Sequence, residues 1–232
     1  MNILLWIGSC RPRCNTGAMA RFLQSEMRRS QVAVHQLDLK DHLGVGPLPD
    51  EVIAGIRASD AIVLLAPVYL DTLPAPILEL LVRLHEQRDA LAGSRPAFYA
   101  VVHSGYLEPV HRVPALETCA HFGRAMGFDW RGGIGFGGTS PIGGAPLENL
   151  GWLTKNLRAS LVLLAQAVRQ GQPVPARALA LAKKRPVPLP LRAIVATLNL
   201  ITKRQLRAKG IHHPWARPYQ NDKPSNDKPS NG

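Results

Sequence analysis

The sequence predicts a doubly wound α/β fold, in which helices cover both faces of a five-stranded parallel sheet. Short apolar runs of the kind found in strands buried on both faces alternate along the chain with segments of helical periodicity. This unit repeats five times without a long extra unit, which favours the strand order 2-1-3-4-5. A chain of 232 residues, 46% of them hydrophobic, suits one such domain with an appendage.

The expected strands are apolar runs bounded by turn residues. The first reads NILLWIG and ends in glycine, and the third reads DAIVLLA. In chain order, the expected strands are 2–8, 32–39, 60–66, 95–103 and 128–136. The last of them opens into a glycine-rich loop that runs to Gly144.

The expected helices fill the intervals between the strands. In the first, Met19, Phe22, Leu23 and Met27 share one face. The third begins with two prolines in its first turn, where proline is tolerated. In chain order, the expected helices are 17–29, 51–58, 74–88, 109–126 and 147–169.

The character of the chain changes after residue 170. Residues 171–190 hold several prolines and predict an extended, Pro-rich connector after the domain at 1–170. Residues 191–210 predict a basic amphipathic helix. Residues 211–232 repeat NDKPS and predict a disordered tail.

The net charge of +12 belongs to this appendage. Residues 1–170 carry 16 Lys and Arg against 14 Asp and Glu, whereas residues 171–232 carry 12 against 2. A nucleic-acid enzyme usually gathers positive charge around its active face. The near-neutral main domain therefore argues against a nucleic-acid partner.

The cysteine content indicates reduced thiols, and the N-terminal segment indicates a cytoplasmic location. The three cysteines, Cys10, Cys14 and Cys119, do not form a disulfide framework or complete a metal-binding set. The apolar runs are shorter than the ~20 residues of a membrane span. Met1 leads directly into a strand without a basic n-region, so we expect no signal peptide.

The loop after the first strand, residues 8–16, predicts an anion site. It reads GSCRPRCNT and leads directly into a helix, whose free N–H groups favour a phosphate. Asn15 or Thr16 is expected to cap that helix, and two arginines are available to neutralise an anion. The loop lacks the frames of a P-loop and of a dinucleotide fingerprint. A polar surface loop with an ordinary helix cap is the alternative.

Two further loops follow strands that end at the same edge of the sheet. The sequence PVYLDTLP starts at Pro67, and HSGYLEP starts at His103. Tyrosines in both loops suit an apolar wall for a planar ring. A strand–helix turn with a buried tyrosine is the alternative for the first of them, and Asp71 is expected there as a helix cap.

Together these loops resemble the flavodoxin-like NAD(P)H-dependent FMN reductases. Gly-Ser-x-Arg-x-x-x-Asn-Thr is similar to the phosphate loop of that family, which commonly has serine at the position of Cys14. The other two loops resemble its P-x-Y loop and a segment found after the fourth strand in one subgroup. The cofactor-binding residues that the resemblance implies are Ser9, Arg11, Cys14, Asn15, Thr16, Pro67, Val68, Tyr69, Leu70, His103, Ser104, Gly105 and Tyr106.

The resemblance implies a flavodoxin-like three-layer sandwich that binds FMN, with NADH or NADPH as co-substrate. Bound flavin would pass electrons to a small acceptor such as a quinone, a flavin, or a nitro or azo compound. We expect neither a catalytic acid or base nor a metal. A flavodoxin-like electron carrier and a flavin-free binding module are the competing interpretations.

The basic appendage leaves several roles open. The helix at 191–210 can pack on the domain or on a partner subunit, because flavin sites of this fold often lie at dimer interfaces. An anionic membrane surface is the alternative. We favour packing in a dimer or tetramer, since the apolar stripe is short and lacks aromatic anchors.

Overall fold

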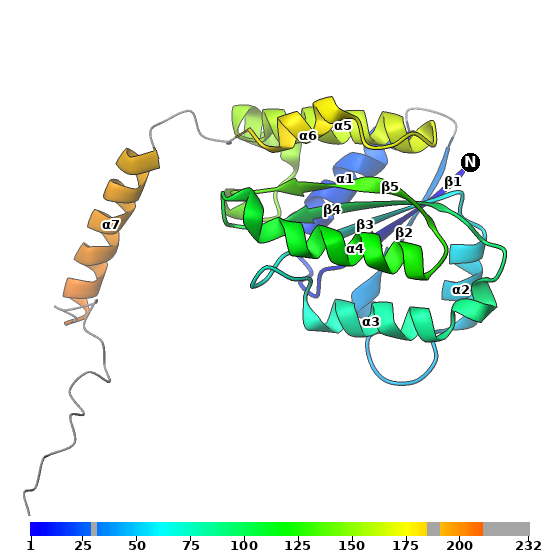
Figure 1. The fold of residues 1–232 in the computed structure, drawn as a ribbon. Coiled ribbons are helices and arrows are strands. Elements are labelled where there is room, and N and C mark those ends of the chain that lie inside the picture. The colour runs from blue at the N-terminus through cyan, green and yellow to red at the C-terminus, as the bar shows by residue number, and fades with distance from the viewer. Residues whose placement is uncertain (29–31, 185–190, 211–232) are drawn as a thin grey trace, which may run out of the picture. The chain divides into compact units, whose positions relative to one another are not determined.

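The computed structural model describes residues 1–28, 32–184 and 191–210. The chain divides into two compact units, Met1–Pro186 and Val187–Gly232. The first unit contains the whole sheet and the helices that cover it, and is the part that positions the candidate site (Figure 1).

The sheet has five parallel strands in the order β2-β1-β3-β4-β5, as the sequence predicts. The strands are β1 (Asn2–Ile7), β2 (Ala33–Asp38), β3 (Ala61–Pro67), β4 (Ala97–His103) and β5 (Asp129–Phe136). Every residue of β3 is buried. Its neighbours β1 and β4 are buried along almost their whole length, which explains their continuous apolar sequences.

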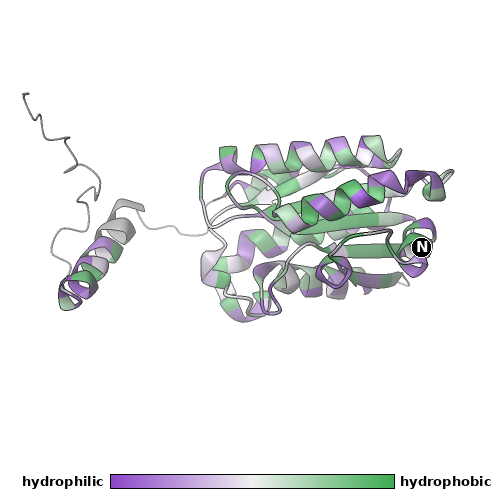
Figure 2. Cartoon of the chain, turned by 90° about the horizontal axis from the view of Figure 1, so that it is seen from below, coloured by the Kyte–Doolittle hydropathy of each residue, from purple (hydrophilic) through white to green (hydrophobic). Residues whose placement is uncertain are grey.

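Helices cover both faces of the sheet (Figure 1). One layer holds α1 (Asn15–Arg28), α5 (Lys155–Arg169) and α6 (Ala176–Ala182), and the other holds α2 (Asp50–Arg57), α3 (Ala75–Glu86) and α4 (Val113–Ala125). Successive strand residues alternate between the two cores: Leu5 faces the first layer, whereas Trp6 faces the second. Figure 2 shows largely hydrophobic strands beside helices in which hydrophobic and hydrophilic residues alternate along the ribbon.

An aromatic cluster fills the second core. Phe98 of β4 lies at its centre, with ring centroids 5.7–6.0 Å from those of Trp6, Phe122, Phe128 and Trp130. The rings meet at tilted or edge-on angles, which is the favourable arrangement for aromatic side chains. This cluster makes the sheet a rigid base for the loops at its carboxyl edge.

Three segments differ from the sequence expectation. The expected helix at 109–126 starts as a 3-10 turn, η3 (Pro109–Arg112), because Pro114 lies in the first turn of α4 and lacks the N–H of a longer helix. The expected helix at 147–169 is divided into η5 (Leu147–Thr154) and α5, with Gly151 in a non-helical conformation. The expectation of an extended connector at 171–190 is wrong for the helix α6.

Alanine content explains α6. Its sequence, ARALALA, consists largely of the strongest helix former, and Pro175 precedes it. Ala178 and Ala182 are buried, and Ser160 of α5 donates a hydrogen bond to the carbonyl of Ala178 at 2.8 Å. The main unit therefore extends beyond residue 170.

The second unit is described through α7 (Leu191–Ala208). This helix agrees with the one expected at 191–210. Leu198, Leu200 and Ile201 are exposed on it. The expected tail at 211–232 lies outside the described residues. Within the described part of the chain, no helix combines the length and the apolar character needed to cross a membrane.

Candidate flavin site

A pocket of about 330 Å³ opens at the carboxyl ends of β1, β3 and β4. In this strand order the chain leaves β1 and β3 toward opposite faces of the sheet, which leaves a crevice where ligands bind in such folds. Its lining residues are Ser9, Arg11, Arg13, Cys14, Asn15, Thr16, Pro67, Tyr69, His103, Ser140 and Gly143. The lining includes two arginines and no aspartate or glutamate, so the pocket favours an anion.

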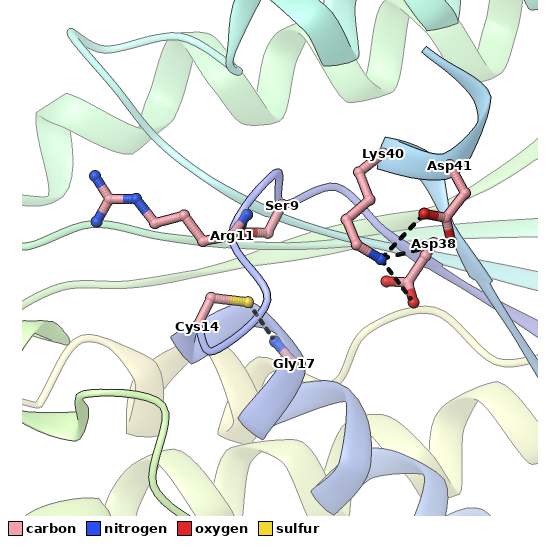
Figure 3. Close-up of polar contacts among 7 residues, drawn as sticks. All are labelled: Ser9, Arg11, Cys14, Gly17, Asp38, Lys40 and Asp41. Atoms are coloured by element: carbon pink, nitrogen blue, oxygen red, sulfur yellow. Dashed lines mark hydrogen bonds and ion pairs between the residues drawn. The ribbon is translucent and has the colours of Figure 1, made fainter.

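Cys14 caps the helix that follows the first loop. Its carbonyl accepts the first helical hydrogen bond, from Ala18 N–H at 3.1 Å, and its Sγ accepts a hydrogen bond from Gly17 N–H at 3.3 Å (Figure 3). Asn15 and Thr16 lie inside α1, so the expectation that one of them is the cap is wrong. Ser9 is buried and accepts a weak hydrogen bond from Arg11 N–H at 3.4 Å.

Replacing Cys14 by serine is expected to strengthen both the helix and the anion site. A hydroxyl is a better cap acceptor and a better donor than a thiol. We expect the free energy of unfolding of Cys14→Ser to rise by about 0.5–1 kcal/mol, and its Kd for FMN to fall severalfold. Urea unfolding and fluorescence titration measure the two quantities. Cys10→Ser, at an exposed position of the same loop, is the matched control and is expected to change neither. Weaker FMN binding by Cys14→Ser would contradict the assignment.

Asn15 joins the first loop to the glycine-rich loop after β5. Its Nδ2 donates to the carbonyl of Thr139 at 2.7 Å, and its Oδ1 accepts from Gly144 N–H at 2.8 Å. Gly144 has a φ of +76°, and a Cβ there would lie 3.1 Å from the Cys14 nitrogen. Glycine is therefore required for the two loops to approach each other so closely.

A buried chain of hydrogen bonds connects Thr16, His103, Thr139 and Ser104. Thr139 Oγ1 donates to the carbonyl of Ser104 at 3.0 Å, so the contact of 3.2 Å between His103 Nδ1 and Thr139 Oγ1 has the imidazole as donor. His103 Nε2 is then the acceptor of the Thr16 hydroxyl at 2.8 Å. Burial lowers the pKa of His103 to about 4, which keeps the ring neutral. His103 and Thr16 thus connect β4 to α1 within the pocket wall.

The second loop closes in a tight turn at the mouth of the pocket. Tyr69 and Thr72 exchange two backbone hydrogen bonds, at 2.9 and 3.2 Å, around Leu70 and Asp71. Both central residues have positive φ, 49° and 66°. The Asp71 carboxylate pairs with His111 Nδ1 at 2.7 Å, so its expected role as a helix cap is wrong; α3 is preceded by Pro74 without a side-chain cap. This pair connects the second loop to η3.

The turn at Leu70 is strained. A left-handed conformation costs a residue with a Cβ roughly 1–2 kcal/mol, whereas asparagine adopts it more easily. Leu70 is 89% exposed and contributes little packing. We expect Leu70→Asn to raise the free energy of unfolding by about 0.5–1 kcal/mol in urea denaturation. Val82→Asn, at an exposed position of α3, controls for the loss of a surface hydrophobe and is expected to lower it.

The third loop, residues 104–107, is hydrogen-bonded by Arg112. The sequence did not indicate this residue. The Arg112 guanidinium is buried and donates to Ser104 Oγ and to the carbonyl of Tyr106, both at 3.0 Å. Ser104 Oγ donates in turn to the carbonyl of Tyr106 at 3.2 Å. The Tyr106 side chain is half exposed, and its ring lies 4.9 Å from that of His111.

The structure brings together most of the residues that the sequence assigned to the cofactor. Those that line the pocket are Ser9, Arg11, Cys14, Asn15, Thr16, Pro67, Tyr69 and His103. Those that do not line it are Val68, Leu70, Ser104, Gly105 and Tyr106. Val68 and Ser104 are buried, and the other three are exposed.

Two lining residues, Ser140 and Gly143, were missed, and Arg13 was expected only as one of the two arginines available to an anion. The arginines of the first loop and the glycines of the loop after β5 were visible in the sequence. The long-range contact that Asn15 makes between them was not, because it depends on the fold.

The residues present fit FMN. A helix N-terminus with two arginines and no acid in the lining suits a phosphate. Pro67 and Tyr69 supply an apolar and aromatic edge for a ring system, and the volume lies within the range of small-molecule sites. Among the residues that the structure describes, no cluster of three or more potential ligands fits a metal ion.

The strand order and the site at the carboxyl edge define a flavodoxin-like α/β protein. Residues 1–113 match the model of the NADPH-dependent FMN reductase family. The match covers β1, β3 and β4 and the three loops that follow them, and so confirms the resemblance found in the sequence. No curated protein sequence matches.

Solved structures share the fold at low sequence identity. An apo form of the NADH:FMN oxidoreductase EMOB is 16% identical, with a TM-score of 0.56 over 82% of this chain and 97% of that one. The NAD(P)H:quinone oxidoreductase from Methanothermobacter marburgensis is 13% identical, with a TM-score of 0.52 over 74% of this chain and 94% of that one. A quinone reductase of Klebsiella pneumoniae has a TM-score of 0.52 at 15% identity, over 75% and 87% of the two chains.

The family match indicates FMN as the cofactor and NAD(P)H as the co-substrate. The class of protein is an NAD(P)H-dependent flavin oxidoreductase.

Proposed function

We propose that this chain binds FMN in the pocket at the ends of β1, β3 and β4 and uses it to pass electrons from a nicotinamide to a small acceptor. The observation that carries this proposal is the lining of the pocket. It combines a helix N-terminus, two arginines and an aromatic side chain, and it contains no aspartate or glutamate. Quinones, free flavins, and nitro or azo compounds are the acceptor classes.

The chain's own residues bind and orient the cofactor. Ser9, the N-terminal N–H groups of α1, Arg11 and Arg13 hold the phosphate. The Thr16 hydroxyl donates its hydrogen bond to His103. The backbone N–H of Thr16 is therefore the donor that would reach the phosphate. Tyr69 would border the ring system of bound FMN.

Bound FMN supplies the hydride and electron transfer, and the protein supplies orientation and electrostatics. The only histidine that lines the pocket, among the described residues, is His103, whose two ring nitrogens are both hydrogen-bonded to threonine hydroxyls. His103 is thus not arranged as a general acid or base, which supports a reaction performed by the cofactor.

Anaerobic reduction tests this function. Protein loaded with FMN is mixed with NADH or NADPH, and loss of the flavin absorbance near 450 nm is followed in a stopped-flow instrument. Rapid bleaching by one nicotinamide, followed by reoxidation on adding a quinone, nitro or azo compound, is expected. A protein that binds FMN but is bleached by neither nicotinamide is an electron carrier. If the protein binds no FMN, the competing interpretation of a flavin-free binding module is supported instead.

We further propose a cytoplasmic homo-oligomer, a dimer or tetramer, in which α7 packs on the protein. The exposed Leu198 and Ile201, three residues apart, give α7 an apolar face that packing would cover. Sizing of the full chain and of a chain ending at residue 186, with sedimentation of both on anionic liposomes, separates packing from membrane binding. Loss of the oligomer on truncation supports packing, and loss of liposome binding supports the membrane surface.

A further inference from the structure

Arg112 is a buried cation whose hydrogen bonds all go to one loop. It ends η3, is 3% exposed, and besides Ser104 Oγ and the Tyr106 carbonyl it contacts the carbonyl of Leu107, from Nη2 at 3.4 Å. Three residues of the loop after β4 thus share one side chain, in addition to the backbone hydrogen bonds that Ser104 and Tyr106 make with Phe136 and Gly138. The same loop follows His103, which lines the flavin pocket, and at Gly105 it lies against Ser140, which also lines it.

Strand β5 and its continuation are shaped to admit this guanidinium. A Cβ at Gly137 would lie 2.8 Å from Arg112 Nη1 and 2.6 Å from the carbonyl oxygen of Tyr106. A Cβ at Gly135 would lie 3.3 Å from Arg112 Nε. Any larger residue at Gly137 would displace Arg112 or the loop. The position of the Arg112 guanidinium therefore requires glycine there.

The positive charge of Arg112 has no direct counter-ion. Within residues 1–28, 32–184 and 191–210, no carboxylate lies within ion-pair distance of it, and its Nε has no hydrogen-bond partner. Burial lowers the pKa of Arg112, and the charge of Glu108 opposes this. An uncompensated buried cation is costly, and negative charge arriving near it is stabilised.

We propose that Arg112 is a positioning residue that holds the loop of Ser104, Tyr106 and Leu107 against the flavin, and that its charge favours the reduced form of that flavin. The inference rests on the proposed function, because it assumes that FMN occupies the pocket. It assigns two separable properties to Arg112: the forked geometry of the guanidinium sets the shape of the loop, and its charge sets the reduction potential. Two-electron reduction adds negative charge to the flavin, so a nearby cation raises its potential.

FMN affinity tests the geometric part. Arg112→Met and Arg112→Lys both lack the fork that reaches three acceptors. Each is expected to weaken FMN binding about tenfold in a fluorescence titration. Arg83→Met is the matched control. Arg83 of α3 also donates to three carbonyls of one loop, those of His42, Gly46 and Pro47, but none of these residues lines the pocket. Its FMN affinity is expected to stay within twofold of the wild-type value.

The midpoint potential of bound FMN tests the charge and would not respond to a merely structural role. Arg112→Met is expected to bind reduced FMN about tenfold less favourably relative to oxidised FMN, which is a fall of about 30 mV for a two-electron couple. Arg112→Lys keeps the charge and is expected to keep the potential near that of the wild type. If Arg112→Met does not fold, Gly137→Ala replaces it in the affinity test and Arg112→Gln in the potential test.

The outcomes separate this inference from the proposed function. Wild-type protein that binds no FMN overturns the proposed function itself. Wild-type protein that binds FMN, together with Arg112 variants of unchanged affinity and unchanged potential, overturns only the inference. A loss of affinity as large in Arg83→Met as in Arg112→Met also overturns it, because the effect would then reflect general destabilisation.

Discussion

Replacing Asn15 by aspartate is expected to weaken FMN binding about 100-fold. The substitution keeps the size of the side chain and the acceptor for Gly144 N–H, but removes the donor to the Thr139 carbonyl. It also places a negative charge in a pocket that has none, next to the helix N-terminus where the phosphate is expected. Fluorescence titration with FMN measures the effect.

Asn149→Asp is the matched control for this prediction. It adds the same charge at a position of η5 that does not line the pocket, and it is expected to leave the Kd for FMN within twofold of the wild-type value. Equal Kd values for Asn15→Asp and wild type would show that the phosphate of FMN does not lie at the N-terminus of α1.

The apoprotein is expected to lose about 3 kcal/mol of stability between pH 7 and pH 4 through His103 alone. The pKa of this histidine falls from 6.5 to about 4 on folding, because burial disfavours the imidazolium. Between these two values the unfolded chain binds more protons than the folded one. The stabilising contribution is therefore complete above pH 6.5 and is lost as the pH falls toward 4.

Urea unfolding of wild type and His103→Asn at a series of pH values isolates this contribution. The variant lacks the titrating ring, so its stability is expected to fall less steeply, and the two curves are expected to converge at low pH. Parallel curves would mean that the imidazole is solvated or charged in the folded protein, contrary to its hydrogen bonds with Thr16 and Thr139.

The sheet could be predicted from the sequence because its central strands are buried on both faces. Continuous apolar runs such as that of β3 are recognisable by composition alone, and the number of repeats indicated the topology. The helix α6 was missed because Pro173 and Pro175 outweighed the alanine-rich segment that comes after them. The packing of Ala178 and Ala182 against the main unit, which stabilises α6, is a tertiary effect.

The phosphate end of the site was also predictable, since a loop between strand and helix carries its function locally. The partners of its side chains were not. Asn15 reaches Gly144, and Thr16 reaches His103, across more than eighty residues of sequence. Arg112 carries no local motif; only the two glycines of β5 and its continuation, which leave room for the guanidinium, hint at a large neighbour.

The most direct test of the account is a titration of the purified apoprotein with FMN and, in parallel, with riboflavin, followed by flavin fluorescence. We expect saturable quenching by FMN and binding of riboflavin at least about tenfold weaker, because riboflavin lacks the phosphate that the helix N-terminus and the arginines hold. Absence of FMN binding, or equal affinity for the two flavins, would contradict it.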